Sequence, residues 1–449
     1  MKSEITIDAS VLPDEQPLQW RRIIVFLLIF LTLAIDGIDT QVTSYLAPTI
    51  AKDWGVSKAA MGILFSVGLA GSALGALTLG ALGDTLGPRR IVIWLTAVIG
   101  VATLAMAYVH TVEQLAALRF VTGVGVGGSL PNLVALASQL APRQRRATLV
   151  TMTGCGFPVG AALAGLLSTW LLASHSWRDV YLAAGAFPLL LLPLMLALLP
   201  DSIPCLLRRR NGQVGAATTL RRLYPGLPVD CHVGWGGVNA RTTRLPLITI
   251  FQGRRAIVSM LLSGIFFLSL MNVYFLANWL PELLQRAHGT PSESLIATTV
   301  FNFGGVAGAL LFGRFIDAFG YRRVLSIGFV CCAASMFVLA NGQFDFQLLL
   351  VAAFTGGFLV LGGQGALNAL PSLLYPSDQH STATGWALGT GRLGSVLGPA
   401  LAGMLLSAHW TNAQVLMLAA LLPLGAATLL TVLTRFAPSS TDSSTTKTL

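Results

Sequence analysis

The sequence predicts an all-α integral membrane protein in which twelve transmembrane helices form two pseudo-symmetric six-helix bundles. Three observations lead to this prediction: the composition, the number of apolar segments, and an internal repeat. Of the 449 residues, 54% are hydrophobic and 10% are charged, and the mean hydropathy is +0.73. Since a soluble domain cannot hide that much apolar surface from water, we expect a lipid bilayer to be the solvent of this chain.

Apolar segments of spanning length recur between Ile23 and Phe436, and we count about twelve of them. They form two groups of six, and the polar stretch between the groups contains clusters of arginine. The predicted domains are an N-terminal cytoplasmic segment (1–22), a six-helix bundle (23–200), a cytoplasmic central loop (201–255), a second six-helix bundle (256–436) and a disordered cytoplasmic tail (437–449).

The chain repeats itself in two places. Residues 80–90 and 313–323 are identical at five of eleven positions, at an offset of 233 residues, and 156–165 resembles 394–403. Gene duplication is the natural cause of such a repeat. Each half is therefore expected to be one six-helix bundle, with the binding site where the halves meet near the middle of the bilayer.

The distribution of positive charge predicts the orientation. With both termini in the cytoplasm, only four of the 28 Lys and Arg residues fall outside (Lys52, Lys58, Arg178 and Arg286), and two fall within spans. The net charge of +10 is then explained by topology and by contact with anionic membrane lipids, and no nucleic-acid partner is expected.

Asp36 and Asp39 lie in the first apolar segment, roughly 20 Å from its start at 1.5 Å per residue. Carboxylates at such a depth are expensive, so we interpret them as a proton-coupling site. Their spacing of three residues places both on one face of a helix. A structural role in capping or pairing is the alternative. Gly37, between them, is expected to leave room for a ligand or water or to loosen the helix.

Arg119 and Arg392 also fall within predicted spans, where an arginine must find an anionic partner. We expect Arg119, in the half that holds the aspartates, to tune the proton site. Arg392, in the other half, is expected to bind a substrate carboxylate through its planar two-donor fork. A fixed ion pair is the alternative for both.

Further polar and aromatic side chains lie in the segments expected around the site. Amides in a span must be hydrogen-bonded, and a phenolic hydroxyl or a carboxylate would be a suitable partner, although bonding between helices is an equally good account. A planar substrate ring would stack on neighbouring aromatic rings. The substrate-binding candidates beside Arg392 are Asn132, Gln364, Asn368, Tyr274 and Trp386.

The repeated Gly-x-x-x-Asp-x-x-Gly-x-Arg-Arg loop resembles the signature of the major facilitator superfamily, and the resemblance covers essentially the whole chain. It implies that the loop residues form a charge lock that opens as the two halves rock. This chain departs from the pattern at Thr85, where the superfamily usually has an arginine or a lysine. The gating candidates are Asp84, Arg89, Arg90, Asp317, Arg322 and Arg323.

Three segments resemble the aromatic acid/proton symporter family more narrowly: Asp36-Gly37-Ile38-Asp39, residues 119–132 and residues 386–399. Ile38 departs from the aromatic residue common there. The resemblance implies proton-coupled import of a hydroxybenzoate or hydroxyphenylpropionate by alternating access. It also implies a multi-pass protein of the bacterial inner membrane, and we expect it to function as a monomer.

Other classes fit less well. No nucleophile elbow or P-loop is present, so an enzyme is not expected. The five cysteines have neither metal-ligand nor disulfide spacing, and we expect no metal or cofactor. The remaining alternatives are a proton-driven antiporter that exports drugs or metabolites on the same fold and, less favoured, a sensor that transports nothing.

Overall fold

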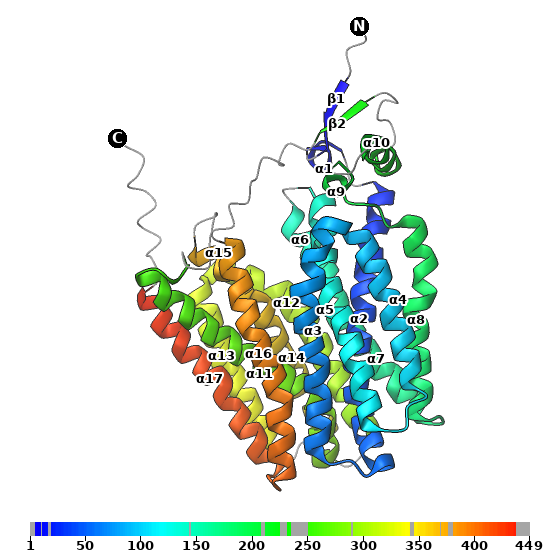
Figure 1. The fold of residues 1–449 in the computed structure, drawn as a ribbon. Helices are drawn as coiled ribbons and strands as arrows, with labels where there is room; N and C mark the ends of the chain where they lie inside the picture. Colours follow the sequence, from blue (N-terminus) through cyan, green and yellow to red (C-terminus); the bar gives the residue numbers. More distant parts are fainter. Residues whose placement is uncertain are drawn as a thin grey trace. The chain divides into compact units, whose positions relative to one another are not determined.

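The computed structural model shows a helical chain that divides into two units, residues 1–243 and 244–449 (Figure 1). The first unit contains the helix that carries both Asp36 and Asp39, and the second contains Arg392. The residues described by the structure are 5–9, 11–16, 19–142, 145–207, 212–224, 231–234, 250–288, 291–341, 345–368, 370–375 and 380–436. The predicted disordered tail at 437–449 lies outside this range.

In the first unit, long helices lie side by side as one bundle (Figure 1). One of its spans is built from two helices, α6 and α7, which are interrupted at Cys155. The helices are α2 (Trp20–Trp54), α3 (Lys58–Leu86), α4 (Pro88–Met106), α5 (Val112–Leu140), α6 (Arg146–Gly154), α7 (Gly156–Leu172) and α8 (Trp177–Leu198).

The second unit has the same number of long helices and one short helix, α15. Its helices are α11 (Arg254–His288), α12 (Pro291–Phe319), α13 (Tyr321–Asn341), α14 (Phe346–Leu367), α15 (Leu370–Leu374), α16 (His380–Ser407) and α17 (Asn412–Phe436). Within the described residues, 11 helical segments are long and apolar enough to cross a membrane. The remaining long helix is α16, whose hydropathy is lowered by its glycines and by Arg392. The prediction of an all-α membrane protein is confirmed, and twelve spans agree with these helices.

The ends of several helices follow from local sequence. Gly55, with φ of +64°, ends α2 in the left-handed conformation that favours glycine. Ser57 and Thr111 cap α3 and α5, because each side chain accepts a hydrogen bond from an amide three residues later. Ser176 and Asp179 form a reciprocal capping box at the start of α8.

Glycines allow α2 and α7 to pack backbone against backbone. A Cβ atom added at Gly156 would overlap the carbonyl oxygen of Phe30, and one added at Gly160 would overlap that of Ala34. Such close approach requires a residue without a side chain. The contact fixes the position of α2, the helix that holds both aspartates.

The second unit contains the same contact between α11 and α16. A Cβ atom at Gly394 would overlap the carbonyl oxygen of Phe267, and one at Gly398 would lie 2.6 Å from that of Met271. These are the glycines that repeat Gly156 and Gly160 in the sequence. The repeat between 156–165 and 394–403 thus corresponds to a repeated helix contact, as expected for two pseudo-symmetric halves.

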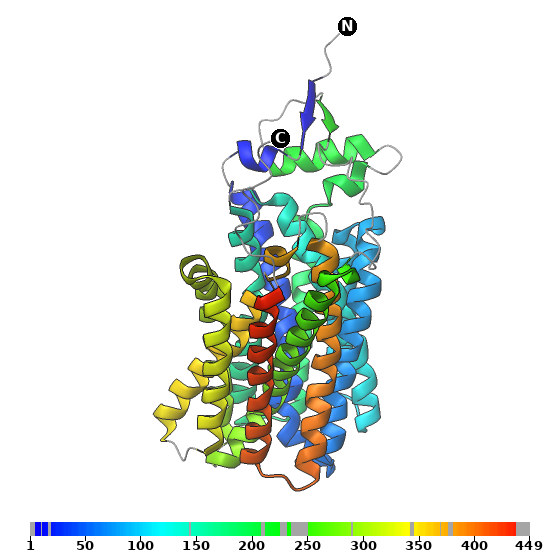
Figure 2. The ribbon, with the colours of Figure 1, turned by 90° about the vertical axis from the view of Figure 1, so that its left-hand side faces the viewer.

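The N-terminal segment and the stretch after α8 form a small cap at one end of the first bundle, which the sequence did not predict. A strand from each segment pairs in parallel, and α10 runs across the end of the bundle (Figure 2). Its elements are β1 (Ile5–Asp8), α1 (Leu12–Glu15), α9 (Ile203–Leu207), α10 (Gly212–Leu223) and β2 (Cys231–Gly234).

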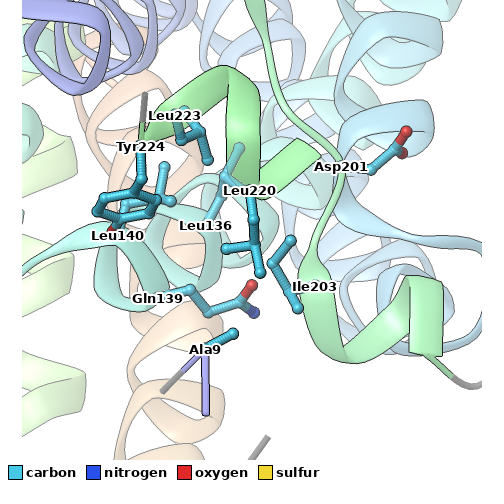
Figure 3. A pocket seen from close by; sticks show the side chains of 9 residues that line it. All are labelled: Ala9, Leu136, Gln139, Leu140, Asp201, Ile203, Leu220, Leu223 and Tyr224. Atoms are coloured by element: carbon cyan, nitrogen blue, oxygen red, sulfur yellow. The ribbon is translucent and has the colours of Figure 1, made fainter. Parts of the chain in front are cut away.

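Arg22, at the start of α2, joins this cap to the bundle. Its side chain is fully buried, lies 5.0 Å from the centre of the Tyr224 ring, and donates to the Tyr224 hydroxyl over 3.0 Å. It also donates to the carbonyl of Gln16. Burial raises the pKa of Tyr224, and the bond from Arg22 opposes that shift. Tyr224, Gln139 and Asp201 help to line a cavity of about 10 Å³ (Figure 3), which has room for about one water molecule.

Gly160→Ala should lower the stability of the protein by about 1–3 kcal/mol, because the new methyl group must push α7 away from α2. Gly154→Ala is the matched control: a Cβ atom there has nothing within 4 Å, and alanine favours the helix. The apparent melting temperatures of the two variants in detergent should therefore differ in sign relative to the unmodified protein. Equal effects would contradict the role given to this contact.

Candidate functional site

Asp39 of α2 and Arg119 of α5 form a buried ion pair in the first unit. The Arg119 guanidinium donates to the Asp39 carboxylate over 3.3 Å, to the Asp39 carbonyl over 2.6 Å and to the Thr40 carbonyl over 3.1 Å. Only 3% of Asp39 and 5% of Arg119 is exposed. Thr103 of α4 donates to the other carboxylate oxygen over 2.6 Å. Both oxygens of Asp39 are therefore bonded, and its charge is balanced.

Asp36 has different surroundings, although it lies one helical turn away. It is 1% exposed, and its Oδ2 accepts a hydrogen bond of 2.6 Å from the Ser129 hydroxyl of α5. Its Oδ1 is buried and has no hydrogen-bond partner among the described residues. No cation is paired with it in that part of the chain. A charge held this way is costly, and a bound proton would remove the cost.

The two aspartates are thus unequal, which the sequence could not show. The pair of Asp39 and Arg119 agrees with the structural alternative of a fixed ion pair, and the proton-coupling role of Asp36, Asp39 and Arg119 stays a prediction. Tyr181 of α8 lies close to the pair, where its hydroxyl bonds to that of Thr43 over 2.9 Å. These contacts balance the charge of Asp39, whereas no cation among the described residues is paired with Asp36.

The expectation that Gly37 leaves room for a ligand or water was wrong. A Cβ atom at Gly37 would overlap the carbonyl oxygen of Phe157 in α7. The glycine therefore permits the close contact between α2 and α7, and it leaves no room for a ligand. The carboxylates of Asp36 and Asp39 instead bond to α5 and α4.

Asn132 bonds within the first unit. Its side-chain amide donates to the carbonyls of Gly128 over 2.8 Å and Leu79 over 3.2 Å. Because Leu79 belongs to α3, the second of these bonds joins α3 to α5, which agrees with the alternative of bonding between helices. The substrate role of Asn132 stays a prediction.

Arg392 of α16 is partly buried in the second unit. Its guanidinium donates weakly to the Tyr274 hydroxyl of α11, over 3.4 Å. The described residues include no carboxylate within ion-pair distance of it. Two of the predicted substrate-binding residues therefore lie together, and the arginine there retains donors for an anion.

The other candidates of this unit form hydrogen bonds in two separate places. Ser269 of α11 donates to Gln364 over 2.6 Å, and Gln364 donates to Asn368 over 3.1 Å. Trp386 donates through its indole nitrogen to Ser263 over 2.7 Å, and its ring lies edge to face with Phe251. Asn368 is exposed at the end of α14, so this chain of amides runs from the helix interior to its end.

The gating candidates are described only in part, because the side chains of Asp84 and Asp317 lie outside the described residues. Arg89 pairs with Asp201 over 3.1 Å and donates to the Leu196 carbonyl over 2.7 Å. The Arg322 side chain lies against the ring of Tyr321, and Arg90 and Arg323 are exposed. Among the gating candidates whose side chains are described, Arg89 is thus paired with Asp201, which follows α8.

Several side chains of the site were missed from the sequence: Thr103, Ser129, Tyr181, Ser269 and Asp201. Hydroxyl groups in a span are common and usually bond to their own helix, so nothing in the sequence distinguishes the first four. Asp201 falls in the predicted central loop, where no local pattern indicates its pairing with Arg89. Within the described residues, no group of three or more His, Cys, Asp or Glu side chains is placed to hold a metal ion.

Comparison with known proteins gives consistent matches over most of the chain. The model of the Major Facilitator Superfamily matches residues 29–266 and 262–448. The gallate transporter of Pseudomonas putida is 32% identical over 89% of this chain and 89% of its own length. The 4-hydroxybenzoate transporter PcaK of Pseudomonas aeruginosa is 34% identical over 91% of this chain and 92% of its own.

A similar fold occurs among solved structures. The xylose transporter XylE from E. coli, in a partially occluded inward-open conformation, superposes with a TM-score of 0.72 at 18% identity. The match covers 95% of this chain and 99% of that protein. At this identity the similarity concerns the fold alone.

Removing one member of the Asp39–Arg119 pair should cost about 3–5 kcal/mol of stability, because the other charge remains buried without a partner. Asp39→Asn with Arg119→Gln together should cost less than the sum of the single substitutions. The measurement is a double-mutant cycle: the apparent melting temperatures of the unmodified protein, the two single variants and the double variant are compared.

The matched control for this cycle is the exposed pair of Arg178 and Asp53, whose charged atoms are 3.8 Å apart. The same cycle there should give a coupling of about 0–1 kcal/mol. Additive costs at Asp39 and Arg119 would show that the two charges are not coupled.

Proposed function

Since the chain belongs to the major facilitator superfamily, we propose that it is a proton-coupled importer of an aromatic carboxylate, of the hydroxybenzoate or hydroxyphenylpropionate type. It is a multi-pass membrane protein of that superfamily. The relatives named as gallate and 4-hydroxybenzoate transporters support the substrate class. We also propose that it lies in a bacterial inner membrane with both termini in the cytoplasm, in line with the distribution of its positive charge.

The observation that carries the proton coupling is the environment of Asp36. This carboxylate is buried within a span, one of its oxygens has no described hydrogen-bond partner, and no described cation is paired with it. An ionised group in that place resists enclosure in a dry intermediate, whereas a protonated one is neutral. In the proposed cycle, Asp36 is protonated when the site is open to the outside and deprotonated when it is open to the inside.

Arg392 is proposed to bind the carboxylate of the substrate. An aromatic acid is an anion at neutral pH, and within a span it requires a positive partner. Arg392 is bonded only weakly to the Tyr274 hydroxyl, and the phenol ring beside it provides a surface for stacking. Gln364 and Asn368 are proposed to bond to polar groups on the ring, as Asn132 is in the other half.

The repeated loops are proposed to form a charge lock on the cytoplasmic side, which holds the outward-facing state and opens as the two halves rock. Arg89, with its bond to Asp201, is the described residue that supports this role. A proton-driven antiporter that exports drugs or metabolites remains the second candidate, because the fold does not fix direction. Gradient-driven accumulation of a labelled aromatic acid in proteoliposomes separates the two: symport fills the vesicles when the outside is acidic, and antiport empties them.

Asp36→Asn should abolish accumulation driven by a proton gradient, because the amide cannot bind and release a proton. Exchange of labelled for unlabelled substrate should survive, since it needs no net proton movement. Asp53→Asn is the matched control, an exposed acid of the same helix, and should accumulate substrate normally. If Asp36→Asn accumulates substrate like the unmodified protein, the coupling site lies elsewhere.

Arg392→Ala should remove binding of the acid, and Arg392→Lys should weaken it by about tenfold, because lysine keeps the charge but loses the planar fork. Calorimetry with 4-hydroxybenzoate and with its uncharged amide is the measurement. The unmodified protein should prefer the acid, and Arg314→Ala, an exposed arginine of the same unit, should keep that preference. A persistent preference for the acid in Arg392→Ala would rule out Arg392 as the partner.

A further inference from the structure

Ser129 has more hydrogen-bond partners than its single proton can serve at once. Its hydroxyl oxygen lies 2.6 Å from Asp36 Oδ2 and 3.0 Å from the carbonyl oxygen of Val126, one turn earlier in α5. The side chain is fully buried. A hydroxyl group has one proton to donate and two lone pairs that accept. At any moment the Ser129 proton can therefore point to only one of these two oxygens.

The choice between them depends on the state of Asp36. When the carboxylate is ionised, Oδ2 can only accept, so the Ser129 proton must point to it. When Oδ2 carries a proton, that proton can be donated to the Ser129 oxygen, and the Ser129 proton is then free to turn to Val126. The hydrogen bond between the two side chains persists in both states, with donor and acceptor exchanged.

The other oxygen of Asp36 is a poorer place for the proton. Oδ1 is buried and has no partner among the described residues, so a proton there would be a buried donor without an acceptor. Such a donor is costly. A proton on Oδ2 can be donated directly to the Ser129 oxygen. The geometry thus favours protonation on the oxygen that faces Ser129.

We propose that Ser129 is a positioning residue for proton coupling, whose hydroxyl turns between Asp36 and Val126 as Asp36 loses and gains its proton. This inference rests on the proposed function of Asp36. Because the Ser129 hydroxyl can turn, it stays hydrogen-bonded to Asp36 Oδ2 whether Asp36 is ionised or protonated. Only Oδ1 lacks a described partner in both states. The turn of the hydroxyl therefore lowers the cost of the ionised and of the neutral form, and a proton can enter and leave within one transport cycle.

Few other charges act on Asp36. Asp39, on the same helix, is the charged group that acts on it electrostatically, and Arg119 of α5 is bound to Asp39. α7 contains no titratable side chain, and Cys155 precedes it. The remaining titratable groups on the helices packed against α2 are Lys58 and Asp84 of α3, Arg89 and Arg90 of α4, Glu113 of α5, Arg146 of α6, Arg178, Asp179 and Tyr181 of α8, and Arg221 and Arg222 of α10.

A serine that bonds to the carbonyl three residues earlier is common in helices and by itself implies only local structure. Thr122 of α5 provides that case: it is fully buried, and its hydroxyl donates to the Arg119 carbonyl over 3.3 Å. Thr122→Ala is therefore the matched control for Ser129→Ala, because it removes a buried hydroxyl from the same helix without a hydrogen bond to a carboxylate.

The test measures the pH dependence of gradient-driven uptake in proteoliposomes. Ser129→Ala removes a bond to a charged group, which is stronger than its neutral counterpart. The neutral form of Asp36 is then favoured, and the pH at which uptake falls to half should move upward by about one unit. Ser129→Thr keeps the hydroxyl and should follow the unmodified protein, whereas Ser129→Cys, a weak donor, should lie between them. Thr122→Ala should show no shift.

Infrared difference spectra provide a second readout. The carbonyl band of protonated Asp36, identified by its loss in Asp36→Asn, should move to higher frequency in Ser129→Ala and stay in place in Thr122→Ala. If the uptake profile and the band of Ser129→Ala coincide with those of the unmodified protein, while Asp36→Asn loses accumulation, the role of Ser129 is refuted and the proposed function stands. Normal accumulation by Asp36→Asn would instead refute the proposed function.

Discussion

The ion pair between Asp39 and Arg119 is the interaction on which the first unit depends. It binds α2 to α5 where a charge without a partner would be costly, and Thr103 of α4 completes its bonding. On the other side, Gly37 brings α2 against the backbone of α7. Asp36, one turn from the pair, is therefore held in a fixed position between rigid neighbours. A fixed position lets a single neighbouring hydroxyl determine the cost of its ionisation.

The two halves share their packing but not their chemistry. The contact of α2 with α7 is repeated by α11 and α16, where Phe267 takes the place of Phe30 and Met271 that of Ala34. By the same correspondence, Val273 and Leu276 stand where the first half has Asp36 and Asp39. Glycines at the contacts preserve the scaffold because a side chain would separate the helices. The polar residues face no such constraint and differ freely between the halves.

This division matches the two tasks of a coupled transporter. The acids are concentrated in the first unit, where the proton is proposed to bind, and the second unit holds Arg392 and the amides of α14. A proton site needs a carboxylate in apolar surroundings, and an anion site needs a fixed cation with free donors.

The sequence by itself determined that this is a membrane protein with twelve spans in two halves. It also identified the charged residues within the spans, whose burial is costly. Hydropathy and repetition are properties of short segments, and a carboxylate within an apolar run is visible without any knowledge of its neighbours. Spacing also placed Asp36 and Asp39 on one face of a helix.

Only the tertiary structure decided which aspartate is paired. The partners of the two acids, Thr103, Arg119 and Ser129, come from helices 64 to 93 residues away along the chain. Whether Arg119 meets Asp36 or Asp39 depends on the rotation and axial position of α5 against α2, which no local sequence pattern reveals. The cap around Arg22 and Tyr224 has the same origin, because it joins residues more than 200 positions apart. Pairing of buried polar groups is decided by helix packing, and it therefore appears only when the chain is folded.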